Sequence, residues 1–292
     1  MFSYQTFRSR FRSSLALWGL VLTMVLSGWR VGTWMVIMAF GLLGQWEFYM
    51  AQKEKGLPVY QKSGVFCGFL LYINTLVCLV YLPNLSEYFW VGEGIVFVLC
   101  LLGALVRLVI SGEPRKTPVV SIALTMLGFI YIAYLFNYVA RVTFWPGDAH
   151  SARFILLYLL AVTKFTDVGA YVVGSMIGKN KMAPVISPGK TWEGCAGGMG
   201  FAMAVSLFMI WLLPGRLGSI GWIDGIILGI MLPLAAILGD LAESVIKRDA
   251  AIKDSGHAIP GIGGILDLID SILFTAPVLY YYLYLTRALW RH

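Results

Sequence analysis

The sequence predicts an all-α, polytopic integral membrane protein with about nine transmembrane helices. Hydrophobic residues make up 59% of the 292 positions and charged residues only 13%, whereas soluble domains carry about 25% charged residues. The apolar residues form long runs, and a helix needs about 20 residues to cross a bilayer. These runs are too long for barrel strands, and unpaired backbone groups are too costly in lipid, so we expect helices throughout.

Nine apolar runs are long enough to be spans. They cover residues 14–29, 31–50, 64–83, 88–110, 118–140, 154–177, 194–213, 219–243 and 264–286. The first run follows three arginines and resembles a signal peptide, but eight further spans behind it favour an uncleaved first helix. The four cysteines lie in apolar runs without metal-type spacing, so we expect small core residues rather than disulfides or metal ligands.

The net charge of +7 is distributed as in a membrane protein, and we expect no nucleic-acid partner. With nine spans starting inside, fourteen lysines and arginines fall in inner segments and six outside, while Arg107 and Lys164 lie within spans. Cytoplasmic loops are enriched in these residues. We therefore expect a multi-pass protein of a bacterial-type inner membrane with a cytoplasmic N-terminus. Its basic inner loops would face anionic lipid headgroups.

The polar residues divide the chain near "SGEPRKTP" (111–118). Residues 1–115 hold four spans with few polar residues, and we expect them to form a scaffold. Glu47, Asn74, Glu93 and Arg107 are expected there in helix packing or at the interface. Residues 116–292 contain two polar segments on the same predicted side of the membrane, and we expect this half to carry the function.

The first polar segment covers residues 163–198 and begins with Lys164 and Asp167. Their spacing places them on one helix face, where they can neutralise each other inside the bilayer. A purely structural ion pair is an equally good interpretation. Gly174 and Gly178 follow as a small-xxx-small pair, which lets two helices approach closely.

"SPGKTWEG" (187–194) combines a predicted Pro-Gly turn with Lys190 and the hydroxyls of Ser187 and Thr191. Glu193 then opens an apolar helix, whose free N–H groups and positive dipole end point at the same place. This pattern indicates an anion site. A plain helix cap beside a solvated lysine is the alternative, and the spacing is not that of a P-loop.

The second polar segment begins at "LGDLAESVIKRD", where Asp240, Glu243, Ser244 and Lys247 lie along one helix stripe. A solvated helix end would show the same stripe. However, Asp240 directly follows a long apolar run and is therefore at or below the membrane surface. An acid at that depth is costly unless it is paired or binds a cation.

"SGHAIPGIGG" (255–264) interrupts the helix, because proline lacks a donor and glycine adds flexibility. The chain then re-enters the membrane with Asp267 and Asp270 on one face of the first turns. Together with Asp240 they form a carboxylate cluster suited to a hard divalent cation. His257 is expected to be solvated.

These segments resemble the phosphatidate cytidylyltransferase (CDP-diacylglycerol synthase) family. The stretch "SVIKRDAAIKDSGHAIPGIGGILDLID" (244–270) is similar to the family signature. Its matching residues are Ser244, Lys247, Arg248, Lys253, Asp254, Gly263, Gly264, Asp267 and Asp270. The stretch 167–194 is similar to the second hallmark, through Asp167, Ser187, Pro188, Lys190, Thr191, Glu193 and Gly194. The resemblance covers about 118–286, but Ile262 and Leu268 stand where the family usually has His and Arg.

The resemblance implies the reaction of CTP with phosphatidate to give CDP-diacylglycerol and pyrophosphate. We assign Mg²⁺ to Asp240 and Asp267, because the bend at 255–264 can bring their carboxylates together, with Asp254 and Asp270 in support and a second cation left open. Four cations would neutralise the phosphates: Lys190, Lys247, Arg248 and Lys253. The expected substrate-binding residues are Asp167, Ser187, Thr191, Glu193, Ser244, Gly263 and Gly264, with Lys190. The expected partners are CTP, phosphatidate and the bilayer, a homodimer is left open, and the active site is expected to be cytoplasmic.

Two alternatives remain at this point. Another CTP-dependent lipid enzyme, such as a CDP-archaeol-type synthase or a polyprenol kinase, would use similar residues. An ion-coupled transporter would also have broken helices and intramembrane acids. Against the transporter, the polar groups collect at the predicted cytoplasmic ends of the spans and the sequence shows no internal repeat.

Overall fold

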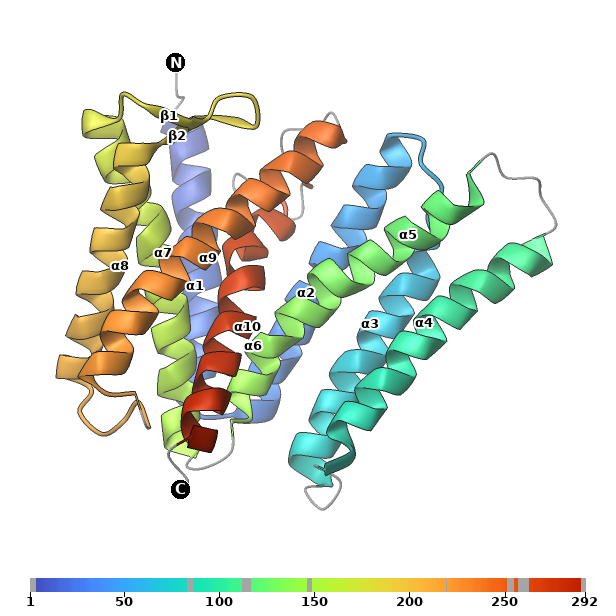
Figure 1. Cartoon of the computed structure of the whole chain (residues 1–292), viewed down its shortest axis with the longest axis horizontal. Helices are drawn as coiled ribbons and strands as arrows, with labels where there is room; N and C mark the ends of the chain where they lie inside the picture. Colours follow the sequence, from blue (N-terminus) through green and yellow to red (C-terminus); the bar gives the residue numbers. More distant parts are fainter. Residues whose placement is uncertain are drawn as a thin grey trace. The chain divides into compact units, whose positions relative to one another are not determined.

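The computed structural model confirms the all-α class (Figure 1). It describes the backbone of residues 4–82, 87–111, 117–145, 149–218, 220–250, 255–256 and 263–289. The helices are α1 (Tyr4–Ser27), α2 (Arg30–Glu54), α3 (Gln61–Leu76), α4 (Phe89–Ser111), α5 (Pro118–Gly128), α6 (Leu135–Thr143), α7 (Ala149–Ile177), α8 (Trp192–Leu212), α9 (Trp222–Asp249) and α10 (Leu266–Leu289). Two π-helical turns, η1 (Val77–Tyr81) and η3 (Phe129–Tyr134), extend α3 and join α5 to α6. A small hairpin, β1 (Lys181–Ala183) and β2 (Ser187–Thr191), precedes α8.

In the described part of the chain, seven helical segments are long and apolar enough to cross a membrane. They are Gln61–Tyr81, Phe89–Ile110, Pro118–Thr143, Ser151–Ile177, Trp192–Leu212, Trp222–Asp249 and Leu266–Thr286. These segments match the last seven predicted spans. The first two predictions fall on α1, whose apolar part is Leu15–Ser27, and on α2, which is long enough but less apolar.

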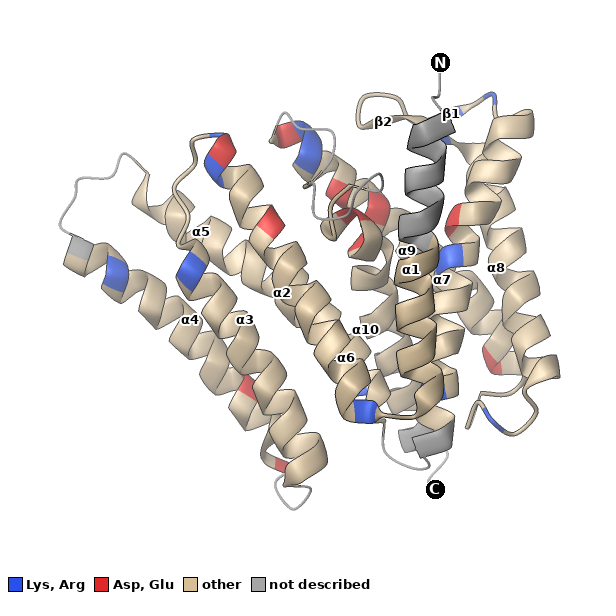
Figure 2. Ribbon diagram, turned by 180° about the vertical axis from the view of Figure 1, so that it is seen from behind, with Lys and Arg blue, Asp and Glu red and all other residues tan. Residues whose placement is uncertain are grey.

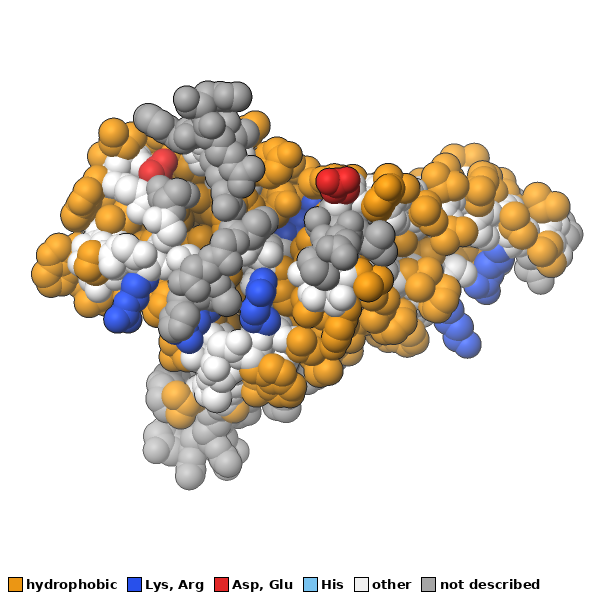
Figure 3. Space-filling view, turned by 90° about the horizontal axis from the view of Figure 1, so that it is seen from below, with side chains coloured by type: hydrophobic (Ala, Val, Ile, Leu, Met, Phe, Trp, Pro, Cys, Tyr) orange, Lys and Arg blue, Asp and Glu red, His pale blue; other side chains and the backbone are white. Residues whose placement is uncertain are grey.

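The helices present hydrophobic side chains outward, as expected for proteins in lipid. Figure 3 shows such side chains over much of one face. On α4, for example, Val109 and Ile110 are 80% and 78% exposed. Charged residues are sparse along the helices (Figure 2). Soluble monomers rarely expose apolar surface on this scale, so the surface fits a bilayer.

The chain folds into two compact units. The first unit contains Met1–Phe144 and Asp249–Ile269, and the second contains Trp145–Arg248 and Asp270–His292. The predicted functional division near residue 115 stays a prediction, because compactness alone does not assign a function. All four cysteines are free thiols, as predicted, and three of them are buried.

Polar side chains tie the helices of the first unit together. The Gln45 side-chain amide donates to the Gly64 carbonyl at 2.9 Å, and the Tyr49 hydroxyl donates to the Thr125 carbonyl at 2.7 Å. Asn137 donates to the Thr75 hydroxyl at 2.8 Å. Hydrogen bonds of this kind join helices where apolar side chains have no preference for protein over lipid.

A buried ion pair lies in the same unit. Arg141, 1% exposed by its side chain, is paired with Glu93, 4% exposed. Aromatic rings surround the guanidinium group, with the Tyr138 ring centre 3.8 Å away. The other rings, at 5.1–5.2 Å, belong to Phe89, Trp90 and Tyr134. The ring faces and the carboxylate together compensate for the lost hydration of the cation.

The second unit depends on a close approach of α7 and α8. A Cβ atom added to Gly174 would lie 3.4 Å from the Gly194 Cα atom, so the two backbones touch. This confirms the packing role predicted for Gly174. Hydroxyl groups add interhelical hydrogen bonds: Tyr158 to Ser206 at 2.6 Å, and Thr163 of α7 to Thr275 of α10 at 3.0 Å. The first turn of α8 is thereby held beside α7.

We predict that Glu93→Gln lowers the free energy of unfolding by about 3 kcal/mol, because it leaves the Arg141 charge buried without its carboxylate. Thermal unfolding in detergent, followed by tryptophan fluorescence, measures the effect. Glu87→Gln is the matched control, since Glu87 is exposed and should change stability by less than about 0.5 kcal/mol. Equal effects of the two substitutions would contradict the structural role of the pair.

Candidate functional site

The stretch "SPGKTWEG" forms a strand and a helix start rather than the predicted turn at Pro188 and Gly189. These two residues lie within β2, and the hairpin turns at residues 184–186. β2 pairs antiparallel with β1, with Lys181 opposite Thr191 and an irregular register. A proline is tolerated here because both strands of a two-stranded hairpin are edges. The hairpin brings Lys190 to the start of α8.

Side chains fasten this hairpin to α8. The Thr191 hydroxyl accepts the N–H of Gly194 at 3.1 Å, which is the helix cap expected at this position. The Glu193 carboxylate accepts the backbone N–H groups of Lys179 and Asn180 at 3.2 Å and the Asn180 side-chain amide at 2.6 Å. The described contacts of Glu193 therefore hold the loop that enters the hairpin.

A pocket of about 410 Å³ lies where α7, the hairpin, α8 and α9 meet. Lys190 and Asp240 both line it, and the Lys190 Nζ atom is 2.8 Å from Asp240 Oδ2. Asp167, Ser187 and Thr191 line it as well. Its wall includes apolar side chains from Tyr171, Met182 and Ile237, together with Cys195. Five of the sequence-predicted site residues thus share one pocket.

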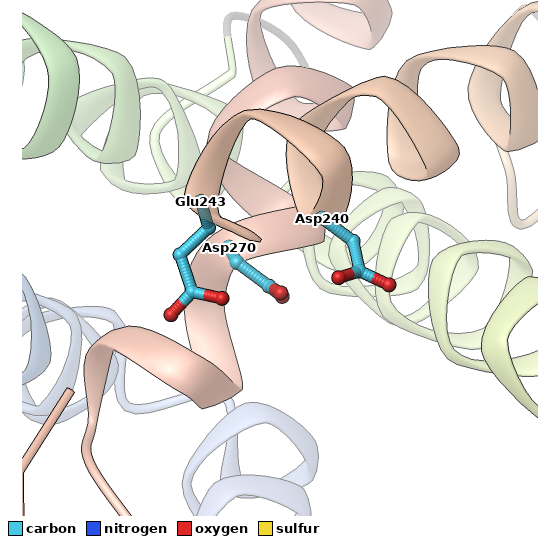
Figure 4. Close-up of side chains that lie close together, drawn as sticks. All are labelled: Asp240, Glu243 and Asp270. Carbon is cyan, nitrogen blue, oxygen red and sulfur yellow. The ribbon is translucent and has the colours of Figure 1, made fainter. Parts of the chain in front are cut away.

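Three carboxylates converge beside this pocket (Figure 4). One oxygen from each of Asp240, Glu243 and Asp270 lies within 4.8 Å of the others. Asp240 and Glu243 stand one turn apart on α9, and Asp270 reaches them from α10. Backbone contact makes the approach possible, since a Cβ atom on Gly239 would lie 2.7 Å from the Asp270 carbonyl oxygen.

Lysines partly neutralise these acids. Besides the Lys190–Asp240 pair, Lys247 lies 2.6 Å from Glu243 Oε2. On α7, the predicted pair of Lys164 and Asp167 is confirmed at 3.5 Å.

Ser271 joins two of the acids. Its hydroxyl lies within hydrogen-bonding distance of Asp167 Oδ1 at 3.4 Å and Asp270 Oδ1 at 3.1 Å. Its backbone N–H also donates to Asp270 at 2.5 Å. Together with Asp240 and Glu243 these make four carboxylates facing three lysines. By formal charge, the four acids exceed the three lysines by one.

The donor set fits a hard divalent cation. Carboxylate oxygens are the ligands that Mg²⁺ prefers, and it commonly takes one or two of them together with phosphate oxygens and water. Glu243 and Asp270 are buried, at 1% and 7% exposure, whereas Asp240 is partly exposed at the pocket. The uncompensated negative charge among these groups favours an added cation.

Three other predicted site residues lie in the first unit, around the start of α10: Gly263, Gly264 and Asp267. The Asp267 carboxylate accepts the backbone N–H groups of Gly264 at 2.9 Å and Ser255 at 3.3 Å. Gly263 has a φ of 122°, a conformation that favours glycine. Leu268 lies within α10. The predicted residues Lys253 and Asp254, with His257 and Ile262, lie outside the described residues.

The remaining predictions concern the end of α9, which continues to Asp249, six residues beyond the predicted span. Arg248 donates from Nε to the Ile186 carbonyl in the hairpin at 3.2 Å, and the Ser244 hydroxyl is 3.5 Å from Asp240 Oδ1. Basic residues in a last helical turn are favourable for the dipole. Glu243 was not among the expected ligands, although its place in the stripe with Asp240 was a usable signal.

Comparison with known proteins identifies relatives over nearly the whole chain. The cytidylyltransferase family profile matches residues 8–286. A phosphatidate cytidylyltransferase of Synechocystis is 31% identical over 285 residues, covering 90% of this chain and 91% of its own.

Two shorter matches agree. Phosphatidate cytidylyltransferases of Haemophilus influenzae and of Staphylococcus aureus strain COL are each 39% identical. The first match covers 49% of this chain and 50% of the relative, and the second covers 53% and 56%. The chain therefore belongs to the cytidylyltransferase family.

Proposed function

We propose that this protein transfers the cytidylyl group of CTP to phosphatidate, giving CDP-diacylglycerol and pyrophosphate. The observation that carries the proposal is the similarity, over about 90% of both chains, to a relative named phosphatidate cytidylyltransferase. The pocket supports it, because it combines a lysine, carboxylates and a helix start at the end of apolar spans. A lipid substrate needs charged groups to bind its headgroup and an apolar surface beside its acyl chains.

The chemistry needs little from a general base. A phosphate oxygen of phosphatidate attacks the α-phosphorus of CTP and forms a new P–O bond. The bond between this phosphorus and the oxygen bridging to the β-phosphorus breaks, and its electron pair leaves with pyrophosphate. A phosphomonoester is already largely ionised at neutral pH, because its second pKa is about 6. Positioning and charge neutralisation therefore supply most of the rate enhancement.

The chain's cations would supply that neutralisation. Lys190 stands at the pocket, held 2.8 Å from Asp240. Lys247 and Arg248 lie in the last turn of α9, and Arg248 is anchored to the hairpin that carries Lys190. An entering phosphate can share these donors with the carboxylates, as charge-assisted hydrogen bonds to phosphate are strong. The positive end of the α8 helix dipole lies beside the same cations.

The carboxylates would hold Mg²⁺, through Asp240, Glu243 and Asp270. When bound, the ion would offset the charge of phosphate oxygens. Asp267, which the sequence also suggested as a ligand, and a second cation stay predictions. Without a cation, Lys190 and Lys247 hold two of these acids in place and limit their mutual repulsion.

The charge distribution supports a cytoplasmic active site in a bacterial-type inner membrane. CTP is made in the cytoplasm, so the hairpin and the end of α9 would have to lie on that side. The excess of Lys and Arg in the inner segments of the nine-span topology favours this orientation.

We expect the purified protein in detergent to form a CDP-lipid and release pyrophosphate from CTP, phosphatidate and Mg²⁺. Lipid products separated by chromatography and a pyrophosphate assay measure the two products independently. Release of CDP with a phosphorylated alcohol would instead identify a CTP-dependent lipid kinase. No turnover of CTP with any lipid acceptor would contradict the proposal and favour an ion-coupled transporter.

Asp240→Asn is expected to lower turnover on the order of 10²-fold or more, because it removes a charge at the proposed metal and phosphate site. The rise in unfolding temperature caused by Mg²⁺ should shrink in parallel. Asp224→Asn is the matched control on the same helix, since Asp224 bonds to the Tyr282 hydroxyl at 2.6 Å and is not part of the pocket. Normal turnover and Mg²⁺ response in Asp240→Asn would refute the assigned site.

Single cysteines test the orientation in a cysteine-free background. Glu54→Cys and Lys181→Cys, both at exposed positions, should react with an impermeant maleimide only from the cytoplasmic side. Arg216→Cys, also exposed, should react only from the opposite side. Labelling of Glu54→Cys and Lys181→Cys from different sides would exclude the nine-span topology.

A further inference from the structure

Glu47 is a buried carboxylate that caps a helix far away in the sequence. It lies on α2 and is 8% exposed. Its Oε2 atom accepts the backbone N–H of Leu266 at 2.9 Å, across a sequence separation of 219 residues. Leu266 is the first residue of α10, and the first four N–H groups of a helix have no partner within the helix. A side chain of the predicted scaffold therefore supplies one of the missing acceptors.

The same carboxylate lies directly against two glycines of the segment before α10. A Cβ atom added to Gly256 would be 2.5 Å from Glu47 Oε1, and one added to Gly264 would be 2.7 Å from Oε2. Both distances are shorter than real contacts of a Cβ atom. A side chain at either position would push against the Glu47 carboxylate, so the glycines leave room for it. Glu47 thus contacts the segment at three positions.

A second carboxylate holds the same backbone. Asp267 Oδ2 accepts the N–H groups of Gly264 and Ser255. Gly264 is therefore in contact with both Glu47 and Asp267, while Leu266 and Asp267 are consecutive in the first turn of α10. A change at Glu47 would be transmitted to Asp267 through one or two peptide groups.

We propose that Glu47 is a positioning residue for the reaction, and this proposal rests on the proposed function. It sets the place and rotation of the first turn of α10, which carries Asp267, with Asp270 one turn further along the helix. Groups that bind metal and phosphate must be held to within about 0.5 Å of their productive geometry. Partners that orient such groups typically contribute 10–100-fold to metal affinity or activity.

Glu93 shows what a purely structural acid of this unit looks like. It is as buried as Glu47, and its partner is the Arg141 side chain rather than the start of α10. Loss of Glu93 should therefore change stability alone. Glu47 differs because its carboxylate accepts a backbone N–H at the start of α10, the helix that carries Asp267 and Asp270.

The test measures Mg²⁺ binding separately from turnover. Glu47→Gln keeps the size of the side chain but removes its charge. We expect it to weaken the apparent Mg²⁺ affinity about tenfold, measured from the rise in unfolding temperature during Mg²⁺ titration without substrate. The Mg²⁺ concentration for half-maximal turnover should rise by a similar factor. Glu93→Gln should lower the unfolding temperature without Mg²⁺ but leave both Mg²⁺ values within about twofold.

Gly256→Ala provides a second, independent variant, because the added methyl group would push against Glu47. If both substitutions act through the same contact, their effects should not add. The Mg²⁺ affinity of the double variant should then be at most about twofold below that of the single variant with the lower affinity. Glu47→Gln with wild-type Mg²⁺ affinity would overturn the proposal. If the wild type responds to Mg²⁺ but makes no CDP-lipid, the proposed function fails, and the thermal titration still decides the role of Glu47.

Discussion

The pairing of acids with lysines at the ends of apolar helices is the constraint on which the second unit depends. Asp240, Glu243 and Asp167 each have a lysine within 3.5 Å. An isolated charge at these positions would be strongly disfavoured. The lysine partners offset part of the cost of burying these acids. In the proposed reaction, the substrate phosphates would pair with the lysines and Mg²⁺ would pair with the carboxylates.

Carboxylates have a second role, in which they accept hydrogen bonds from backbone N–H groups at helix starts and in loops. Glu47, Glu193 and Asp267 all accept backbone N–H groups, and so does Asp224, which accepts from Gly221 at 2.8 Å. In a protein with 15 acids in 292 residues, these uses account for much of the acidic content of the described spans. Several of the described acids therefore either accept backbone N–H groups or pair with lysines.

Both roles of the carboxylates, pairing with lysines and accepting backbone N–H groups, occur on α9 and α10. α9 places Asp240 and Glu243 one turn apart, and Gly239 lets the α10 backbone come close enough for Asp270 to join them. The hairpin contributes Lys190. The Thr191 hydroxyl caps α8, and the Glu193 carboxylate accepts hydrogen bonds from the loop before the hairpin, so both side chains hold the hairpin to α8. Rigid helices with short polar attachments are well suited to phosphoryl chemistry, because precise placement of charge supplies most of the catalysis.

The sequence alone was enough to predict the helical membrane class, the last seven spans, the Lys164–Asp167 pair and the free cysteines, because each depends on local periodicity or composition. Five residues of the pocket were also predicted as site residues, because they stand in two polar segments among apolar ones: Asp167, Ser187, Lys190, Thr191 and Asp240. The Lys190–Asp240 pair, the addition of Glu243 to the acids, the strand at Pro188 and the contact of Glu47 with Leu266 were decided by tertiary structure. Periodicity shows which residues share a face of one helix, but not which helix that face will meet. That choice depends on close packing at small residues such as Gly174 and Gly239, where the absence of a side chain allows two distant backbones to touch.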